Sequence, residues 1–127
     1  MTAFLLDTHA WAWSLSGDGR LSAAALNAID GADTVLVSPI SFFEIAQKVR
    51  LGKWPEMEPF AANLGDLLSQ QGGTQANFDA TVCITAGLME WSHRDPFDRL
   101  LAATARRHNV SLVSADSVFD GVVDRVW

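Results

Sequence analysis

The sequence predicts an α/β fold of three layers, with a central parallel β-sheet and helices on both of its faces. Short apolar runs at residues 3–6, 34–37 and 110–113 are typical of strands that are buried on both faces. Segments with helical periodicity and helix-start residues lie between these runs. Because strands that alternate with helices build parallel sheets, the order of the elements predicts this architecture.

The expected elements cover most of the chain. Strands are expected at residues 3–6, 34–37, 74–77, 110–113 and 121–127, and helices at residues 8–15, 22–30, 39–51, 59–71, 80–89 and 96–108. No internal repeat, linker or low-complexity tract interrupts this alternation, and 127 residues with 49% hydrophobic composition suit one hydrophobic core. The sequence therefore predicts a single domain over residues 1–127.

Capping residues in the first half of the chain support the element boundaries. Ser22 is placed to N-cap the second helix, which Gly31 ends. Ser38 followed by Pro39 is typical of a helix start after a strand, because proline is tolerated in the first helical turn. The apolar spacing of that third helix continues to about residue 51, and Gly52 stands where a C-terminal glycine is expected.

The second half carries similar signals, with one weak segment. Gly72 and Gly73 end the fourth helix, and the short strand expected at 74–77 has little support from its own residues. Asp95 before Pro96 is typical of a helix start, and Asn109 ends that last helix. A valine-rich segment at the C-terminus predicts a final strand.

The composition indicates a cytoplasmic protein. Cys83 is the single cysteine, so no intrachain disulfide forms, and we expect a buried thiol in a reducing compartment. The N-terminus lacks the basic region of a signal peptide, and no apolar stretch is long enough to span a membrane. The net charge of −6 disfavours nucleic-acid binding unless cations neutralise part of it. Two divalent cations held by clustered acids would do so locally.

Four acids are expected to meet at one edge of the sheet. Asp7 and Asp116 follow predicted strands. Glu44 lies in the second turn after a predicted strand, and Asp98 lies in the first turn of a predicted helix. In a parallel α/β sheet, ligands bind beyond the carboxyl ends of the strands, where these positions converge. Carboxylates are the ligands that Mg²⁺ and Mn²⁺ prefer. Two such ions about 3.5 to 4 Å apart would promote in-line attack on a phosphodiester.

Each acid also has a purely structural interpretation. Asp7 is placed to N-cap the first helix, and Glu44 would complete a capping box with Ser41. Asp98 is at the third helical position after the cap, and Asp116 is typical of a turn. Capping and metal binding are compatible, because a helix N-terminus keeps a carboxylate ionised. Spacing alone leaves both interpretations open.

Asp95 and Asp98 compete for the third position in the acidic cluster. Asp95 stands directly before Pro96, so it is the natural N-cap and its oxygens would bind backbone amides. Asp98 would then be the freer carboxylate. We therefore expect Asp98 to belong to the cluster.

Four segments together resemble the PIN domain, and most of all the VapC toxins. They are LLDTHAWAW at 5–13, VSPISFFEIAQK at 37–48, HRDPFDRLLAATA at 93–105 and LVSAD at 112–116. The third segment is the most specific of them. The likeness extends over nearly the whole chain, although GGTQANFDATVCIT at 72–85 departs from the family pattern and leaves the third strand in doubt.

The resemblance implies an endoribonuclease that depends on Mg²⁺ or Mn²⁺. It further implies an RNA substrate, a cognate antitoxin of a type II toxin–antitoxin pair, and a homodimer. By motif position, Asp7, Glu44, Asp98 and Asp116 carry over as both the catalytic and the metal-binding acids.

Three further residues are candidates for contact with RNA or for orienting the acids. Thr8 follows the first acid, and Arg94 and Arg99 flank the third acid in sequence. Exposed arginine beside such a site commonly binds phosphate, although solvated helix surface explains it equally. His9 is a weaker candidate, as a base or a phosphate contact.

Two other functions fit an α/β domain with an acid after its first strand. One is a phosphoacceptor domain, a phosphatase or a receiver, in which Asp7 would be the nucleophile. A phosphatase of that kind would carry a second Asp where His9 stands, and a receiver would carry an acidic pair where Leu5 and Leu6 stand. The other is a catalytically inactive partner-binding module that uses the acids only as caps.

Overall fold

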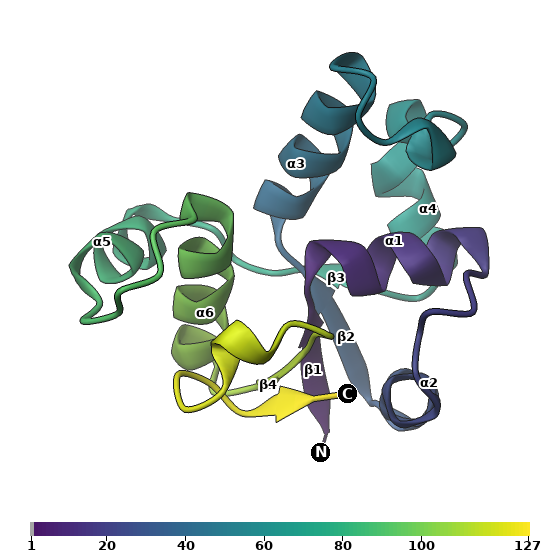
Figure 1. Cartoon of the computed structure of the whole chain (residues 1–127). Coiled ribbons are helices and arrows are strands. Elements are labelled where there is room, and N and C mark those ends of the chain that lie inside the picture. Colours follow the sequence, from purple (N-terminus) through teal and green to yellow (C-terminus); the bar gives the residue numbers. More distant parts are fainter. Residues whose placement is uncertain (1) are drawn as a thin grey trace.

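The computed structural model describes residues 2–127 and has the predicted α/β architecture (Figure 1). Its strands are β1 (Ala3–Leu6), β2 (Thr34–Val37), β3 (Thr74–Gln75), β4 (Ser111–Val113) and β5 (Arg125–Val126). Its α-helices are α1 (Thr8–Ser16), α2 (Ala23–Gly31), α3 (Pro39–Arg50), α4 (Leu64–Gln70), α5 (Ala80–Leu88) and α6 (Pro96–His108). The five strands form one sheet in the order β3-β2-β1-β4-β5. Every pair of neighbouring strands in it is parallel.

The register of the three inner strands sorts their side chains onto two faces. Leu5 of β1 pairs with Leu36 and Leu112, and these three side chains belong to one core cluster with residues of α6. The next residue of each strand points the other way, because side chains alternate along a strand. Those next residues are Leu6, Val37 and Val113, which pack with α1 and parts of α2, α3 and α4.

The helices cover both faces of the sheet, as expected for three layers. Figure 1 shows α5 and α6 on one side of the sheet, and α1, α2 and α4 on the other. Helix α3 rises from the carboxyl end of β2, and contacts both α1 and α6. It therefore stands over the edge at which the strands end.

The capping residues act largely as the sequence indicates. The side chains of Ser22, Ser38 and Asp95 accept hydrogen bonds from backbone N–H groups in the first turns of α2, α3 and α6. Asn109 ends α6 with a φ of 51°, in the left-handed conformation that asparagine tolerates better than most residues.

Three expectations about local structure are wrong. The helix expected over residues 59–71 is divided into a 3-10 turn, Ala61–Asn63, and the short α4. The final strand is confined to Arg125–Val126, because the preceding valines belong to a turn that packs under α6. The thiol of Cys83 is exposed on α5 rather than buried.

None of the helices within residues 2–127 is both long enough and apolar enough to cross a membrane.

Replacing Leu112 tests the central role of β4 in the core. Its side chain is 0% exposed between the sheet and α6, so Leu112→Ala removes packed methyl groups and leaves a cavity. We expect the free energy of unfolding, measured by urea denaturation, to fall by about 2–5 kcal/mol. The matched control is Leu26→Ala on α2, whose side chain is 45% exposed and whose loss is expected to change stability little. Equal losses for both variants would contradict this description of the core.

Candidate active site

A polar cavity of about 220 Å³ lies where the carboxyl ends of the strands meet α3 and α6. It is lined by Asp7, Thr8, His9, Glu44, Lys48, Asp95, Asp98, Leu101 and Asp116. The four acids expected at this edge therefore lie around one cavity, although they come from four separate parts of the chain. Their chemical roles stay a prediction at this point.

Asp7 links the central strand to α1 and is the most deeply placed of the acids. Its backbone N–H donates to the Val113 carbonyl, and its Oδ1 accepts from the Ala10 N–H at 2.8 Å, so it is the N-cap of α1. Burial raises the pKa of Asp7, whereas hydrogen bonds from Ser114 and Ala10 oppose that rise. The negative charge of Asp98 raises the pKa further.

A buried hydrogen bond joins α1 to α3 beside the cavity. The hydroxyl oxygens of Thr8 and Ser41 lie 2.9 Å apart, and both residues are buried. The capping box expected between Ser41 and Glu44 is absent, because Ser38 caps α3 instead. Glu44 forms an ion pair with Lys48, whose Nζ lies 2.8 Å from Oε2. The cavity thus contains an ammonium group opposite its acids.

Asp98 and Asp95 both line the cavity, but Asp95 is also the N-cap of α6. The Oδ1 of Asp95 accepts hydrogen bonds from the N–H groups of Phe97 and Asp98, as the sequence predicts. The carboxylate of Asp98 lies 2.7 Å from Nε2 of His93. Burial raises the pKa of Asp98, the hydrogen bond to His93 lowers it, and the charges of Asp95 and Asp116 raise it. Burial is therefore the main cause of the raised pKa of Asp98.

Asp116 is the most exposed of the four acids. It follows β4 and N-caps a 3-10 turn by accepting from the Val118 N–H at 3.0 Å. Its own N–H donates to the hydroxyl of Ser114, a residue that is 0% exposed. The hydroxyl of Ser114 also lowers the pKa of Asp7, so one buried side chain lies beside both acids.

The donor set of the cavity fits a hard divalent cation. Four carboxylates supply the oxygen ligands that Mg²⁺ and Mn²⁺ require, and a cation would offset the burial and repulsion that raise the pKa of Asp7 and Asp98. Among residues 2–127, no three carboxylate, imidazole or thiolate groups are arranged closely enough to hold an ion. Glu44 and Asp98 are instead paired with Lys48 and His93.

Three residues of this environment were not found by sequence reasoning. His93 contacts Asp98, Lys48 pairs with Glu44, and Ser114 supports both Asp7 and Asp116. The i,i+4 spacing of Glu44 and Lys48 is a recognisable signal of a helical ion pair. His93 lies across a turn from Asp98, and nothing in its spacing specifies that contact.

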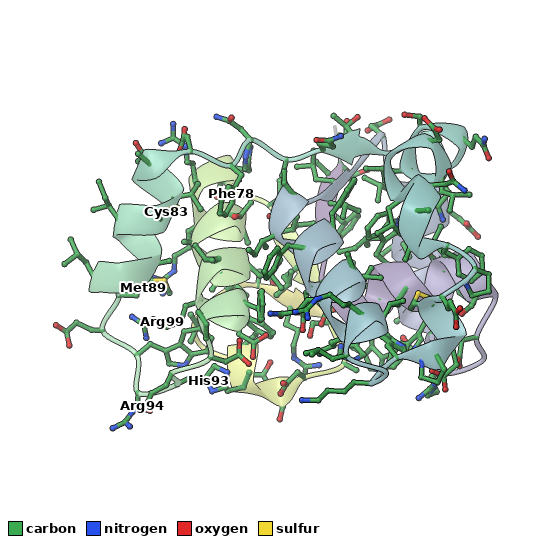
Figure 2. The ribbon with its side chains drawn as sticks, turned by 90° about the horizontal axis from the view of Figure 1, so that it is seen from above. Phe78, Cys83, Met89, His93, Arg94 and Arg99 are labelled. Carbon is green, nitrogen blue, oxygen red and sulfur yellow. The ribbon has the colours of Figure 1, made fainter. Side chains whose placement is uncertain are left out.

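The candidates for RNA contact lie in different surroundings. Thr8 lines the cavity but is only 3% exposed, and its hydroxyl is bound to Ser41, which favours an orienting role. Arg94 is exposed on the segment before α6 (Figure 2).

Arg99 points away from the acids and donates to backbone carbonyls. Because its N–H groups are engaged there, this arrangement does not support the expected RNA contact of Arg99. His9 lines the cavity with an exposed ring that lies 4.7 Å from the ring of Trp54.

Comparison with known proteins defines the class to which this fold and cavity belong. The family model of the PIN domain matches residues 4–124. The chain therefore belongs to the PIN-domain family, as the sequence motifs predict. It is 35% identical over 117 residues to "Ribonuclease VapC22" of Mycobacterium tuberculosis, and this match covers 91% of the chain and 88% of that protein.

Solved structures share the fold over nearly the full length. One is VapBC2 from Rickettsia felis bound to a promoter DNA fragment, with a TM-score of 0.67, 16% identity and coverage of 98% of this chain and 97% of the other. A toxin–antitoxin complex from Klebsiella pneumoniae has a TM-score of 0.68, 18% identity and coverage of 97% and 95%. FitAcB from Neisseria gonorrhoeae has a TM-score of 0.58, 19% identity and coverage of 96% and 95%. At these identities the likeness shows a shared fold.

The burial of Asp7 predicts that its charge destabilises the fold in the absence of metal. A raised pKa means that the native state holds the proton more tightly than the unfolded chain. The stabilisation that this bound proton gives the native state is complete below the ordinary pKa of 3.8, and it is lost as the pH rises through the higher native pKa. We expect Asp7→Asn in EDTA to unfold at a higher temperature than the wild type at pH 7, with a smaller difference near pH 4. Asparagine preserves the helix cap.

Thermal unfolding followed by circular dichroism measures this effect. The control is Asp30→Asn, because Asp30 is exposed near the end of α2. An Asp7→Asn variant that is less stable than the wild type at pH 7 without metal would show that the carboxylate is needed for folding.

Proposed function

We propose that this chain is a metal-dependent endoribonuclease that hydrolyses RNA phosphodiester bonds, and that it is the toxin of a type II toxin–antitoxin pair. The observation that carries the proposal is the convergence of Asp7, Glu44, Asp98 and Asp116 on one cavity. Membership of the PIN-domain family and 35% identity to a protein named as a ribonuclease support it. All four acids are retained, which disfavours the inactive binding module. The family match disfavours the phosphoacceptor domain.

In this proposal the four carboxylates hold Mg²⁺ or Mn²⁺. We take Asp7 and Asp98 as the main ligands, because both line the cavity and burial raises the pKa of each, a penalty on the charged form that a bound cation would offset. Glu44 and Asp116 complete the donor set. When bound, the metal supplies Lewis acidity that lowers the pKa of a ligated water and stabilises charge on the phosphate.

The protein groups around the acids position them and govern the local charge. Ala10 N–H and Ser114 fix the carboxylate of Asp7, and the Thr8–Ser41 hydrogen bond keeps α1 and α3 at a constant separation. The ammonium of Lys48 offers a charge-assisted hydrogen bond to a phosphate oxygen once it leaves Glu44. Such a bond would offset the net charge of −6 close to the cavity.

The proposed biological setting is cytoplasmic, with a cognate antitoxin that blocks the cavity and with a homodimeric toxin. Support comes from the folds that resemble this chain, since two of them are described as VapBC2 and as a toxin–antitoxin complex. Arg94 is exposed on the segment before α6 and remains the proposed contact for the RNA backbone, and Thr8, which lines the cavity, is proposed to orient Asp7.

Neutralising Asp98 tests the metal site directly. We expect Asp98→Asn to reduce RNA cleavage in Mg²⁺ or Mn²⁺ by at least about 100-fold, since even the outer partners of metal ligands change activity by 10- to 100-fold. EDTA should abolish cleavage by the wild type. The control is Asp66→Asn on α4, an exposed first-turn acid away from the cavity. Cleavage that persists in both EDTA and Asp98→Asn would overturn the metal-site proposal.

Growth on expression tests the toxin role separately. Induction of the wild-type chain is expected to arrest bacterial growth, whereas Asp98→Asn at the same protein level is not. If the gene immediately upstream encodes a small protein, its co-expression should restore growth. Unimpaired growth with active soluble enzyme would contradict the toxin role and leave the nuclease activity in place.

A further inference from the structure

Arg99 uses its whole guanidinium group to bind backbone carbonyls. The side chain leaves the first turns of α6 on the side away from the cavity and extends toward the end of α5 (Figure 2). It makes five hydrogen bonds: Nε to Ala86 at 2.9 Å, Nη1 to Trp91 at 2.7 Å and to His93 at 2.9 Å, and Nη2 to Met89 at 2.6 Å and to Gly87 at 3.5 Å. A guanidinium has five N–H donors, so these acceptors match its full capacity.

The charge of Arg99 is stabilised by dipoles rather than by an acid. No carboxylate within residues 2–127 forms an ion pair with it. Ala86 and Gly87 are in the last turn of α5, where unpaired carbonyls and the helix dipole favour a cation. The remaining three acceptors belong to the segment between α5 and α6, which has no regular secondary structure. Arg99 therefore links this segment, residues 89–95, to both α5 and α6 through hydrogen bonds.

The segment that Arg99 holds places His93 against Asp98, which lines the cavity. The His93 carbonyl accepts from Arg99 at 2.9 Å, while its imidazole Nε2 lies 2.7 Å from the Asp98 carboxylate. The ring of Trp91 lies 5.0 Å from the His93 ring and 5.8 Å from that of buried Phe119, which limits the movement of the imidazole. Two consecutive residues of α6 thus bind His93: Arg99 donates to its carbonyl, and Asp98 contacts its imidazole.

We propose that Arg99 is a positioning residue, which sets the orientation of the Asp98 carboxylate by fixing His93. The proposal rests on the proposed function in taking Asp98 as a metal ligand. Outer partners of metal ligands fix the ligand's orientation, and their loss weakens metal binding. Lysine cannot replace Arg99, because an ammonium has three donors at one point and cannot reach five carbonyls spread from Ala86 to His93.

The experiment compares Arg99→Lys with Arg106→Lys in the intact chain. Arg106 is on the same helix and donates through Nε to one carbonyl, that of Val122, so it is a matched control. We expect Arg99→Lys to weaken Mn²⁺ binding about 10-fold by electron paramagnetic resonance titration, and Arg106→Lys to leave it unchanged. In metal-free protein, the imidazole nitrogen signals of His93 should shift in Arg99→Lys alone.

A double-mutant cycle separates positioning from a general structural role. If Arg99 acts through His93, His93→Gln alone weakens Mn²⁺ binding as Arg99→Lys does, and the double variant weakens it no further. Additive losses, or unchanged Mn²⁺ affinity and His93 signals in Arg99→Lys, overturn the proposal. If Arg99→Lys does not fold, one glycine inserted after Ser92 lengthens the segment that Arg99 holds instead, and unchanged Mn²⁺ affinity there overturns it.

The readouts also distinguish this inference from the proposed function. Mn²⁺ affinity and the His93 signals are measured without RNA. RNA cleavage with an unaltered Mn²⁺ affinity in Arg99→Lys refutes the positioning role alone. Absence of both cleavage and Mn²⁺ binding in the wild type refutes the proposed function, and a His93 shift in Arg99→Lys would still support the contact between Arg99 and His93.

Discussion

The site depends on the register of three parallel strands. Leu6, Val37 and Val113 lie side by side, so β1, β2 and β4 end at the same level and release their next residues at one edge. A slip of one residue would exchange the two faces of a strand and carry Asp7 toward the core. The apolar side chains on either side of β1 oppose such a slip, because Leu5 and Leu6 are 0% and 2% exposed in different clusters. The hydrophobic core therefore places the acids.

The four acids of the cavity are bound by different groups of the protein. Each carboxylate has a partner of its own: a backbone N–H for Asp7 and Asp116, Lys48 for Glu44, and His93 for Asp98. These contacts limit repulsion in a cavity that concentrates negative charge. Two of the partners are cationic or protonatable groups that a metal ion would have to replace or reorient.

The sequence predicts the elements and the acidic edge well, because both follow from local patterns. Strand ends, proline at the start of α3 and α6, and the cap at Asp95 are short-range features, and they suffice to bring four acids toward one edge. The contacts that refine the site depend on tertiary structure. Nothing near Ser41 indicates that its hydroxyl meets Thr8 rather than Glu44, and nothing near Arg99 indicates that it turns toward α5. The exposed Cys83 shows the same limit, since an apolar helix predicts burial only when a neighbour covers every face.

The two edges of the sheet determine how copies of this chain can associate. β3 and β5 contain two residues each, and β5 includes Arg125, whose guanidinium is held by Asp120. Strands this short present too few free N–H and C=O groups to recruit an extended segment from another molecule. Sheet-to-sheet growth into fibrillar aggregates is thus disfavoured by the fold itself.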